Sequence, residues 1–342
     1  MNLYPLLRSL VFRLDAERAH RLSIAALKLL PARTPPVFDP VLASTIAAVR
    51  FPSPVGLAAG YDKDAEVFAQ LLGLGWGFVE VGTITPLPQP GNARPRSFRL
   101  VEDRAAINRF GFNSCGQEEA LERVRLRQRG AGLLGINLGA NKDSADRVGD
   151  YTSGLTRMAP SADYVTINIS SPNTPGLRQL QDEGALRDLL AQLREARRPG
   201  GPPIFLKVAP DQGEGEPKQI VRAAIDHGID ALIVGNTTVS RPALRSRYAD
   251  EAGGLSGAPL RALALDTLRR FRSETGGALP LVGVGGIGSA DDAWDRIRAG
   301  ASLVQVYTAM IYEGPGLGLR IARGLAERLR REGMQSVAEA VG

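Results

Sequence analysis

Cysteine and histidine are scarce in this sequence: its 342 residues include one cysteine, Cys115, and two histidines, His20 and His227. A single cysteine excludes an internal disulfide framework and any cysteine-rich metal site. Two histidines argue against a histidine metal cluster or a histidine-based catalytic triad, so we expect no bound metal. The chain also lacks an unbroken run of about 18 apolar residues, the length that a membrane-spanning helix requires.

A cleavable signal pattern is missing as well, because Arg8, Arg13 and Asp15 interrupt the apolar stretch near the N-terminus. This predicts a cytoplasmic setting. The net charge of +6, with arginine far outnumbering lysine, favours anionic partners such as phosphate, carboxylate or an acidic membrane surface. Nucleic acid is not expected as a partner, since no recognition motif or basic-aromatic stripe accompanies the charge.

Short runs rich in valine, isoleucine and leucine recur along the chain, separated by amphipathic segments. We expect strands at residues 55–59, 77–82, 133–138, 164–169, 204–208, 230–235, 280–285 and 302–307. Apolar strands that alternate with helices indicate a parallel sheet covered on both faces. Eight such units in about 270 residues predict the α/β class and a (β/α)8 TIM barrel, whose chemistry lies at the C-terminal ends of its strands.

Small and polar residues follow the expected strands. The densest group is Asn168-Ile-Ser-Ser-Pro-Asn-Thr-Pro-Gly-Leu-Arg178, directly after the fourth strand. Amide side chains offer both donors and acceptors, which suits a planar polar ligand better than a metal. The other strand ends carry Ala59–Lys63, Gly82–Thr83, Asn137, Lys207, Asn236–Thr238, Gly285–Gly286 and Tyr307–Thr308. We therefore expect one ligand site on this rim of the barrel.

The segment Gly283–Gly288 spells G-x-G-x-x-G, the fingerprint of dinucleotide-binding folds. That fold also requires an acidic residue about 20 positions later, at the end of the next strand. The next strand, Leu303–Tyr307, contains no acid. In a barrel, the loops after the seventh and eighth strands commonly bind phosphate. We therefore assign Gly285 and Gly286 to a phosphate group and not to NAD.

In the motifs at these strand ends, the chain resembles the quinone-dependent, membrane-associated (class 2) dihydroorotate dehydrogenases. The resemblance extends from about Pro5 to the final helix. The most specific motifs are Gly56–Lys63, Asn108–Asn113, Asn168–Arg178 and Gly253–Pro259. The resemblance implies one FMN per chain and oxidation of (S)-dihydroorotate to orotate in de novo pyrimidine (UMP) biosynthesis. It also implies ubiquinone or menaquinone as the electron acceptor.

The resemblance assigns roles to matching residues. FMN would contact Ala59, Gly60, Lys63, Thr83, Asn137, Asn168, Lys207, Gly257, Gly286, Tyr307 and Thr308. Orotate would contact Lys63, Asn108, Gly111, Phe112, Asn168, Asn173, Asn236 and Thr237. Ser171 would be the catalytic base, where class 1 relatives carry cysteine. Because a neutral hydroxyl is a weak base and no histidine is close in sequence, we expect a water relay helped by Thr174.

Three other functions are consistent with parts of the sequence. A class 1 dihydroorotate dehydrogenase would pass electrons to fumarate or NAD, but Ser171 and the N-terminal extension argue against it. A cofactor-free phosphate-binding aldolase or isomerase could use Lys63 or Lys207 as a Schiff-base lysine. Such an enzyme would leave the amide cluster unexplained. A non-catalytic binding module would leave the whole set of polar strand ends without a role.

Residues 1–36 are not needed to close a barrel, so we divide the chain into this extension and a catalytic barrel at 37–342. One apolar helical stripe consists of Leu3, Leu6, Leu7, Leu10, Val11 and Leu14. Asp15 is the expected N-cap of a second helix that ends at Pro31 and continues the stripe through Ala19, Leu22, Ala26, Leu29 and Leu30.

Five basic residues accompany the two helices of the extension: Arg8, Arg13, Arg18, Arg21 and Lys28. They favour a peripheral hairpin on anionic lipid, at the cytoplasmic face of the cell membrane. The sequence alone is equally consistent with a helical cap packed on the barrel. The resemblance favours the first interpretation and implies an apolar tunnel for the quinone, with His20 and Arg99 near its head group and Tyr307 at the inner end.

Overall fold

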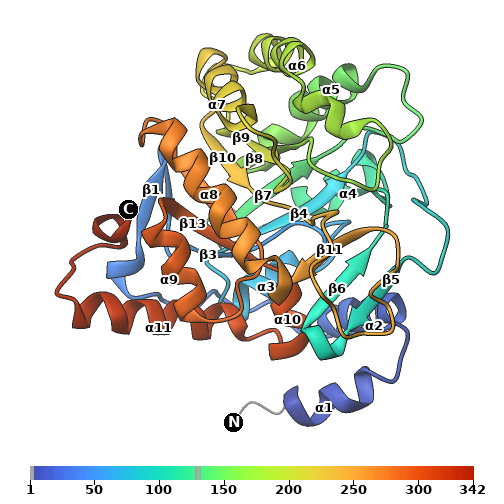
Figure 1. Cartoon of the computed structure of the whole chain (residues 1–342), viewed down its shortest axis with the longest axis vertical. Helices are drawn as coiled ribbons and strands as arrows, with labels where there is room; N and C mark the ends of the chain where they lie inside the picture. The colour runs from blue at the N-terminus through green and yellow to red at the C-terminus, as the bar shows by residue number, and fades with distance from the viewer. Residues whose placement is uncertain (1–3, 128–129, 131) are drawn as a thin grey trace.

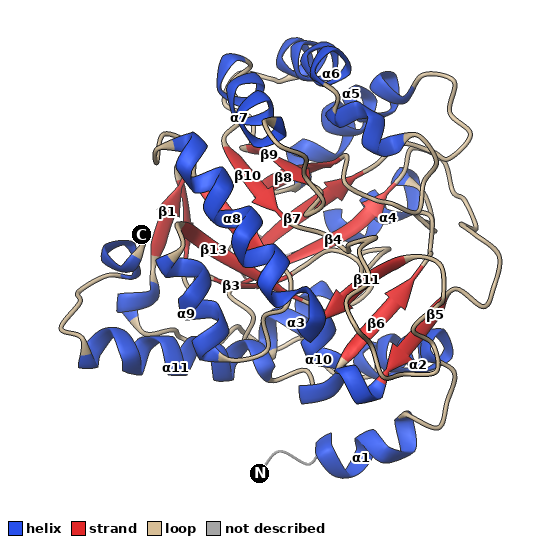
Figure 2. Cartoon of the chain, in the orientation of Figure 1, coloured by secondary structure: helices blue, strands red, loops and turns tan. Residues whose placement is uncertain are grey.

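The computed structural model describes residues 4–127, 130 and 132–342. Eight parallel strands form a closed barrel in the order β3, β4, β7, β8, β9, β10, β12, β13 (Figure 2). Their bounds are β3 Val55–Leu57, β4 Phe78–Ile84, β7 Leu133–Leu138, β8 Tyr164–Asn168, β9 Ile204–Val208, β10 Ala231–Val234, β12 Leu281–Val284 and β13 Ala301–Val306. All eight predicted strands are confirmed, and so is the predicted (β/α)8 barrel.

Helices surround the strands on the outside of the barrel (Figures 1 and 2). They are α3 Phe68–Gly73, α4 Gln117–Arg125, α5 Arg147–Met158, α6 Glu183–Ala196, α7 Glu216–Asp226, α8 Arg261–Thr275, α9 Ala290–Arg298, α10 Thr308–Glu313 and α11 Leu317–Arg331. Short 3-10 helices span Pro40–Leu42, Val101–Asp103, Ala159–Ser161, Leu177–Gln181, Ala258–Leu260 and Val337–Ala340. In α6 the buried residues Leu186, Leu189 and Leu193 recur at helical spacing, so one face packs on the sheet.

Within the described residues, five strands lie outside the barrel. The hairpin of β1 Ser44–Ile46 and β2 Val49–Phe51 brings Phe51 against Phe78 and Tyr164, where it helps to close the N-terminal end of the barrel. The antiparallel strands β5 Ser97–Leu100, β6 Ala105–Asn108 and β11 Gly254–Gly257 form a small separate sheet. These strands contribute residues to the cavity described below, so the small sheet covers part of the rim.

The N-terminal extension forms two helices, α1 Tyr4–Val11 and α2 Ala16–Lys28. The side chain of Asp15 accepts a hydrogen bond from the Arg18 N–H at 2.9 Å, which confirms the predicted N-cap. Figure 1 shows α1 at the edge of the molecule, below α2 and α10. Leu3 of the predicted stripe lies outside the described residues. No helix among the described residues is long and apolar enough to cross a membrane.

The two faces of α2 differ. Ile24 and Leu27 are buried and join the main hydrophobic core, whereas Leu22 is 51% exposed and Leu29, directly after the helix, is 86% exposed. Buried Glu17 pairs with Arg96, which is itself buried next to β5. The extension is therefore partly a cap packed on the barrel, and it still presents apolar side chains to the outside.

Candidate active site at the barrel rim

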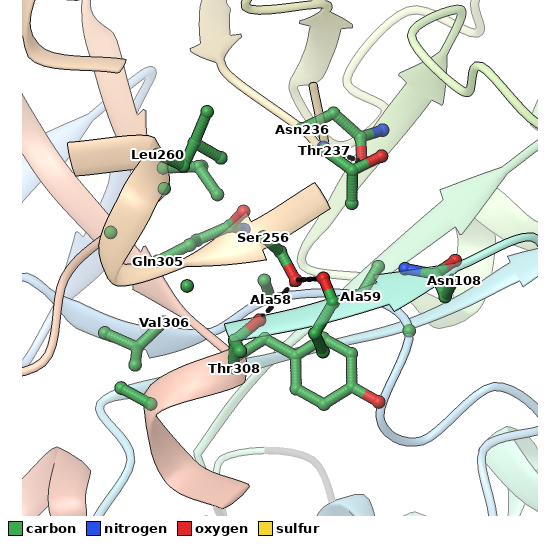
Figure 3. A pocket seen from close by; sticks show the side chains of 18 of the residues that line it. Ala58, Ala59, Asn108, Asn236, Thr237, Ser256, Leu260, Gln305, Val306 and Thr308 are labelled. Carbon is green, nitrogen blue, oxygen red and sulfur yellow. Dashed lines mark hydrogen bonds between the residues drawn. The ribbon is translucent and has the colours of Figure 1, made fainter. Parts of the chain in front are cut away.

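A cavity of about 390 Å³ opens at the C-terminal ends of the barrel strands, between them and the β5–β6–β11 sheet. This volume is within the range of small-molecule and cofactor sites. The cavity is lined by these predicted residues: Ala59, Gly60, Lys63, Thr83, Asn108, Gly111, Phe112, Asn168, Ser171, Asn173, Lys207, Asn236, Thr237, Gly257, Gly286, Tyr307 and Thr308. Figure 3 shows Asn108, Asn236 and Thr308 reaching the same space from different elements.

Asn137 is the predicted cofactor residue that does not line this cavity. It is fully buried on β7, and its Oδ1 accepts hydrogen bonds from Thr83 Oγ1 at 2.7 Å and from Asn168 Nδ2 at 3.1 Å. Both donors line the cavity. Asn137 thus lies directly behind two residues that can touch a ligand, and its direct contact with a cofactor stays a prediction.

The glycines at one end of the cavity leave room that a side chain would fill. Gly286 has φ +70°, and a Cβ there would lie 2.6 Å from the Arg261 backbone nitrogen. Gly257 has φ +97°, and a Cβ would approach the Arg104 carbonyl oxygen to 2.5 Å. Only glycine adopts these conformations without strain. Backbone exposed in this way, in the loop after β12, is suited to a phosphate group.

Two lysines supply positive charge to the cavity: Lys207 is buried and Lys63 is half-buried. Burial lowers the pKa of Lys207, and the nearby carboxylate of Glu80 opposes that effect. Burial and, more weakly, Arg96 lower the pKa of Lys63 to about 8, although Asp64 raises it. The Lys63 ammonium also lies 4.4 Å from the centre of the Phe110 ring. Two cations with little water around them suit an anionic ligand and a cofactor on which negative charge develops.

Ser171 and the surrounding asparagines form the other side of the cavity. Ser171 Oγ accepts a hydrogen bond from the Asn173 N–H at 3.2 Å, and Asn173 Nδ2 donates to Asn108 Oδ1 at 3.4 Å. Phe112 has φ +54°, an uncommon value for a residue with a side chain. This backbone bend holds its ring against the cavity wall. Donors and acceptors therefore converge on a space beside Ser171.

Three polar atoms of residues that line the cavity have no protein partner within the described chain: Asn113 Oδ1, Thr237 Oγ1 and Gln305 Oε1. All three atoms are buried. A buried polar atom without a partner is costly, so each calls for a ligand or a water. A flavin carries ring N–H and carbonyl groups, and FMN adds a phosphate. The orphaned atoms, the space left by Gly257 and Gly286, and the two lysines together fit such a cofactor.

The cavity also continues toward the N-terminal helices. Ser97 of β5 and Ile311 of α10 line it, and these two elements contact α2 and α1; Tyr307 lines the cavity as well. An aromatic series leads outward from Tyr307: its ring is 6.1 Å from that of Tyr61, which is 5.1 Å from His20. Burial and Lys63 lower the pKa of His20 to about 4, so its imidazole is neutral at pH 7.

The two predicted quinone residues are not among those that line the cavity. His20 lies on α2 beside Tyr61. Arg99 donates to the backbone oxygens of Val11 and Leu14, and its guanidinium lies 4.8 Å from the centre of the Phe12 ring. Arg99 therefore ties β5 to the C-terminal end of α1. Whether either residue meets a quinone stays a prediction.

Some cavity residues were not predicted from the sequence, notably Gln305, Ser256, Arg104 and Ser97. Ser256 and Arg104 belong to the small rim sheet or its connection, and that sheet had not been predicted. Gln305 is the polar residue in the otherwise apolar run Leu303–Val306. This buried amide inside an expected strand was a usable signal.

The family model of dihydroorotate dehydrogenase matches residues 41–329 of this chain. The chain belongs to the dihydroorotate dehydrogenase family. It is 63% identical over 340 residues to "Dihydroorotate dehydrogenase (quinone)" of Erythrobacter litoralis, with 99% of both chains covered. It is 58% identical over 347 residues to the protein of the same name from Novosphingobium aromaticivorans, with 100% of this chain and 99% of the relative covered. The class 2 membership that the motifs predicted is confirmed.

The fold of this dihydroorotate dehydrogenase family member is also found in solved structures. The structure of Eimeria tenella DHODH in complex with ferulenol superimposes with a TM-score of 0.91 at 40% sequence identity. The match covers 96% of this chain and 95% of that one. The ligand-free Eimeria tenella structure gives the same TM-score and identity. Family membership implies a flavin cofactor, which agrees with the fit of the cavity.

Proposed function

We propose that this chain oxidises (S)-dihydroorotate to orotate in de novo pyrimidine biosynthesis, with one FMN per chain and a membrane quinone as electron acceptor. The observation that carries the proposal is the rim cavity, in which Lys207, Lys63, Ser171 and the asparagines converge. When bound, FMN supplies the hydride acceptor of the reaction. Lys207 would balance the negative charge that the flavin gains, and Gly257 and Gly286 would receive the phosphate.

The substrate would lie between Lys63 and the asparagines. Dihydroorotate is an anion with a carboxylate, imide N–H groups and carbonyl oxygens. Lys63 opposes the carboxylate charge, and Asn108, Asn173 and Asn236 donate to and accept from the polar edge of the ring. These amides come from three different segments, so together they can fix the orientation of the ring.

Ser171 would remove the proton from C5 of dihydroorotate. Its hydroxyl lines the cavity, but among the described residues it has no histidine as a hydrogen-bond partner that could raise its basicity. The hydroxyl of Thr174, three residues along, is buried and has no partner in the described chain. This unpartnered group is available to hold a water through which the proton leaves.

For the second half-reaction, the quinone would enter between the N-terminal helices and reach the flavin past Tyr307. Ser97 of β5 and Ile311 of α10 line the cavity, and these two elements contact α2 and α1. The exposed leucines of α1 and α2, together with the basic residues beside them, would rest on the anionic cytoplasmic face of the membrane. His20 would be a neutral hydrogen-bonding group beside this path.

The purified protein tests the proposal directly. It should be yellow, bleach under anaerobic conditions when dihydroorotate is added, and regain its colour with ubiquinone or menaquinone but not with fumarate or NAD. Recovery of colour with fumarate or NAD would indicate a class 1 activity. A colourless protein with full secondary structure would instead favour a cofactor-free barrel enzyme.

A further inference from the structure

A fully buried carboxylate lies inside the barrel, behind the cavity. Glu80 of β4 has zero exposure, and donors from three other strands surround it. Asn137 Nδ2 donates to Oε1 at 2.7 Å, and Gln305 Nε2 donates to Oε2 at 2.7 Å. The hydroxyls of Tyr164 and Thr166 also donate to Oε2, at 3.0 and 3.1 Å. Four donors around one carboxyl group are the environment that a buried negative charge requires.

An ionised carboxylate accepts hydrogen bonds and donates none, so it determines how neighbouring amides are oriented. Asn137 must turn its NH2 group to Glu80, which leaves its Oδ1 toward Thr83 and Asn168. Gln305 must also turn its NH2 group to Glu80, which leaves its Oε1 without a partner in the described chain. Gln305 lines the cavity (Figure 3), so Glu80 fixes the atom that this amide offers there.

The directed hydrogen bonds continue beyond Asn137. Because Asn168 donates to Asn137 Oδ1, its own Oδ1 faces Ser170, whose hydroxyl donates to it at 2.7 Å. Ser170 Oγ in turn accepts a hydrogen bond from Asn236 Nδ2 at 2.7 Å. Ser170 is fully buried and Asn236 lines the cavity. Each donor in this series points back toward Glu80, so the series has one direction from the substrate side to the barrel interior.

We propose that Glu80 is a positioning residue for the reaction: it fixes the atom that Gln305 presents to the flavin and, through Asn137, Asn168 and Ser170, the atom that Asn236 presents to the substrate. The inference rests on the proposed function, because it assigns the two ligands to the two ends of the series. It goes beyond that function in giving a role to Glu80 and Ser170, neither of which need touch a ligand.

The test uses the holoenzyme and two dissociation constants. The Kd of FMN is measured from flavin fluorescence on dilution, and the Kd of orotate from the change in flavin absorbance. Glu80→Gln keeps the size of the side chain but introduces an NH2 group. That group would face the NH2 of Asn137 or of Gln305, so one amide must turn over. We expect Glu80→Gln to raise both dissociation constants about tenfold, the effect of losing one or two hydrogen bonds.

Ser170→Ala cuts the series between Asn168 and Asn236. We expect it to raise the Kd of orotate about fivefold to tenfold and to leave the Kd of FMN within twofold. Phe205→Leu is the matched control for loosening of the barrel interior, since Phe205 stacks on Tyr164 at 4.6 Å and makes no polar contact in the series. It should lower the Tm and leave both dissociation constants within twofold.

Several results would overturn the proposal. One is a Glu80→Gln protein with both dissociation constants unchanged, and another is a change in FMN binding alone. If Phe205→Leu raises the two dissociation constants as much as Glu80→Gln does, the cause is a general loosening of the barrel interior and not the positioning of amides by Glu80. If Glu80→Gln does not fold, Ser170→Ala decides, and unchanged orotate binding then refutes the series. If orotate does not change the flavin absorbance of the wild-type protein, the proposed function is refuted. The Kd of FMN in the wild type and in Glu80→Gln would still test the role of Glu80.

Discussion

The cavity rim and the first helix of the N-terminal extension are held in place in different ways. At the rim, Asn168, Lys207 and Ser171 are each less than a tenth exposed, and the Asn168 amide is hydrogen-bonded to Thr83 and Asn137 of two other strands. By contrast, α1 contacts α10 through polar bonds, from Tyr4 Oη to the Ile311 oxygen at 2.6 Å and from Arg8 Nη1 to the Tyr312 oxygen at 2.8 Å. Its Leu7 and Leu10 are more than half exposed.

This difference matches the two half-reactions that we propose. Oxidation of a small polar anion needs groups fixed in advance, because misplaced donors and charges forfeit stabilisation of the transition state. Admission of a long apolar quinone needs an apolar surface that is not filled by the protein itself. A helix held by a few polar bonds, with its leucines exposed, meets that second need. The following predictions test whether the two regions serve the two half-reactions separately.

The largest effect is expected from Ser171→Ala. Loss of the base should slow flavin reduction by dihydroorotate by roughly two to four orders of magnitude, the usual contribution of a general base. Bound FMN should remain, since Ser171 is not among the residues that we assign to the cofactor. Single-turnover absorbance of the flavin under anaerobic conditions measures the rate. A rate equal to that of the wild type would contradict the assignment of Ser171.

A smaller effect, confined to the second half-reaction, is expected from deletion of α1. A chain that begins at Asp15 should be reduced by dihydroorotate at the normal rate. Its turnover with long-tailed quinones should fall about tenfold or more, because exposed apolar surface that binds the tail is lost. It should also bind anionic liposomes more weakly. Full activity with long-tailed quinones, in a folded and flavin-loaded protein, would show that α1 is only structural.

Deletion of the whole extension, residues 1–36, is the matched comparison. From the sequence, these residues form one extension that is not needed to close the barrel, so flavin reduction by dihydroorotate should be spared when they are removed. In the structure, Ile24 and Leu27 of α2 belong to the main hydrophobic core, and Glu17 of α2 forms an ion pair with Arg96. We therefore expect this longer deletion to lower the Tm as well, whereas deletion of α1 alone should not. Equal Tm values for the two deletions would contradict this distinction.

The sequence predicted the rim better than it predicted the surroundings of the rim. Strand ends such as Asn137, Lys207 and Asn236 follow apolar runs, so alternation of strands with helices was enough to bring them to one edge. Strands β6 and β11 are only four residues long, and their pairing joins segments about 150 residues apart. No local pattern marks such a pairing. The resulting sheet, and the part of the cavity it builds, could not be read from periodicity.

The amide network illustrates the same limit at the level of single residues. Asn168 and Asn236 were predicted as ligand residues because polar groups at strand ends face the site. Glu80 lies in the middle of the strand Phe78–Ile84, and nothing local shows that its neighbours come from β7, β8 and β13. The orientation of an amide depends on these distant partners. Sequence patterns therefore locate such a residue but do not say which atom it offers.

We expect the affinity for orotate to depend on pH because of Lys63 in the rim cavity. Burial lowers the pKa of its ammonium group to about 8, so the free enzyme loses this charge as the pH rises through 8. An anionic ligand then binds only with uptake of a proton, and the Kd of orotate should rise up to about tenfold for each pH unit above 8. Binding should be nearly constant from pH 6 to 7.5, where Lys63 is protonated.

The matched control for this dependence is Lys63→Arg. A guanidinium stays charged throughout this range of pH, so the slope above pH 8 should disappear even if the affinity itself changes. Titration of the flavin absorbance with orotate measures both. His20 does not contribute, because its pKa is about 4. A slope that persists in the arginine variant would assign the pH dependence to another group.

The smallest effect concerns the contact that joins the extension to the rim. The carboxylate of Glu17 receives hydrogen bonds from Arg96 Nη2 at 2.8 Å and Arg96 Nε at 3.0 Å. Burial raises the pKa of Glu17, but Arg96 and Arg94 together lower it by more than burial raises it. The pKa of Glu17 is therefore below its ordinary value. A lowered pKa means that the pair stabilises the fold above the ordinary pKa of glutamate and that this stability is lost as the pH falls below it.

Glu17→Gln should therefore lower stability by about 1–2 kcal/mol at pH 7, a decrease of a few degrees in Tm. The difference from the wild type should shrink as the pH falls below the ordinary pKa of glutamate, because the wild type then loses the stability that the lowered pKa supplies. Glu183→Gln is the control: Glu183 is half exposed and pairs with Arg187 at 3.5 Å on the surface of α6, so its loss should leave the Tm unchanged. If α2 is held only by its apolar face, Glu17→Gln and Glu183→Gln will give the same Tm at every pH.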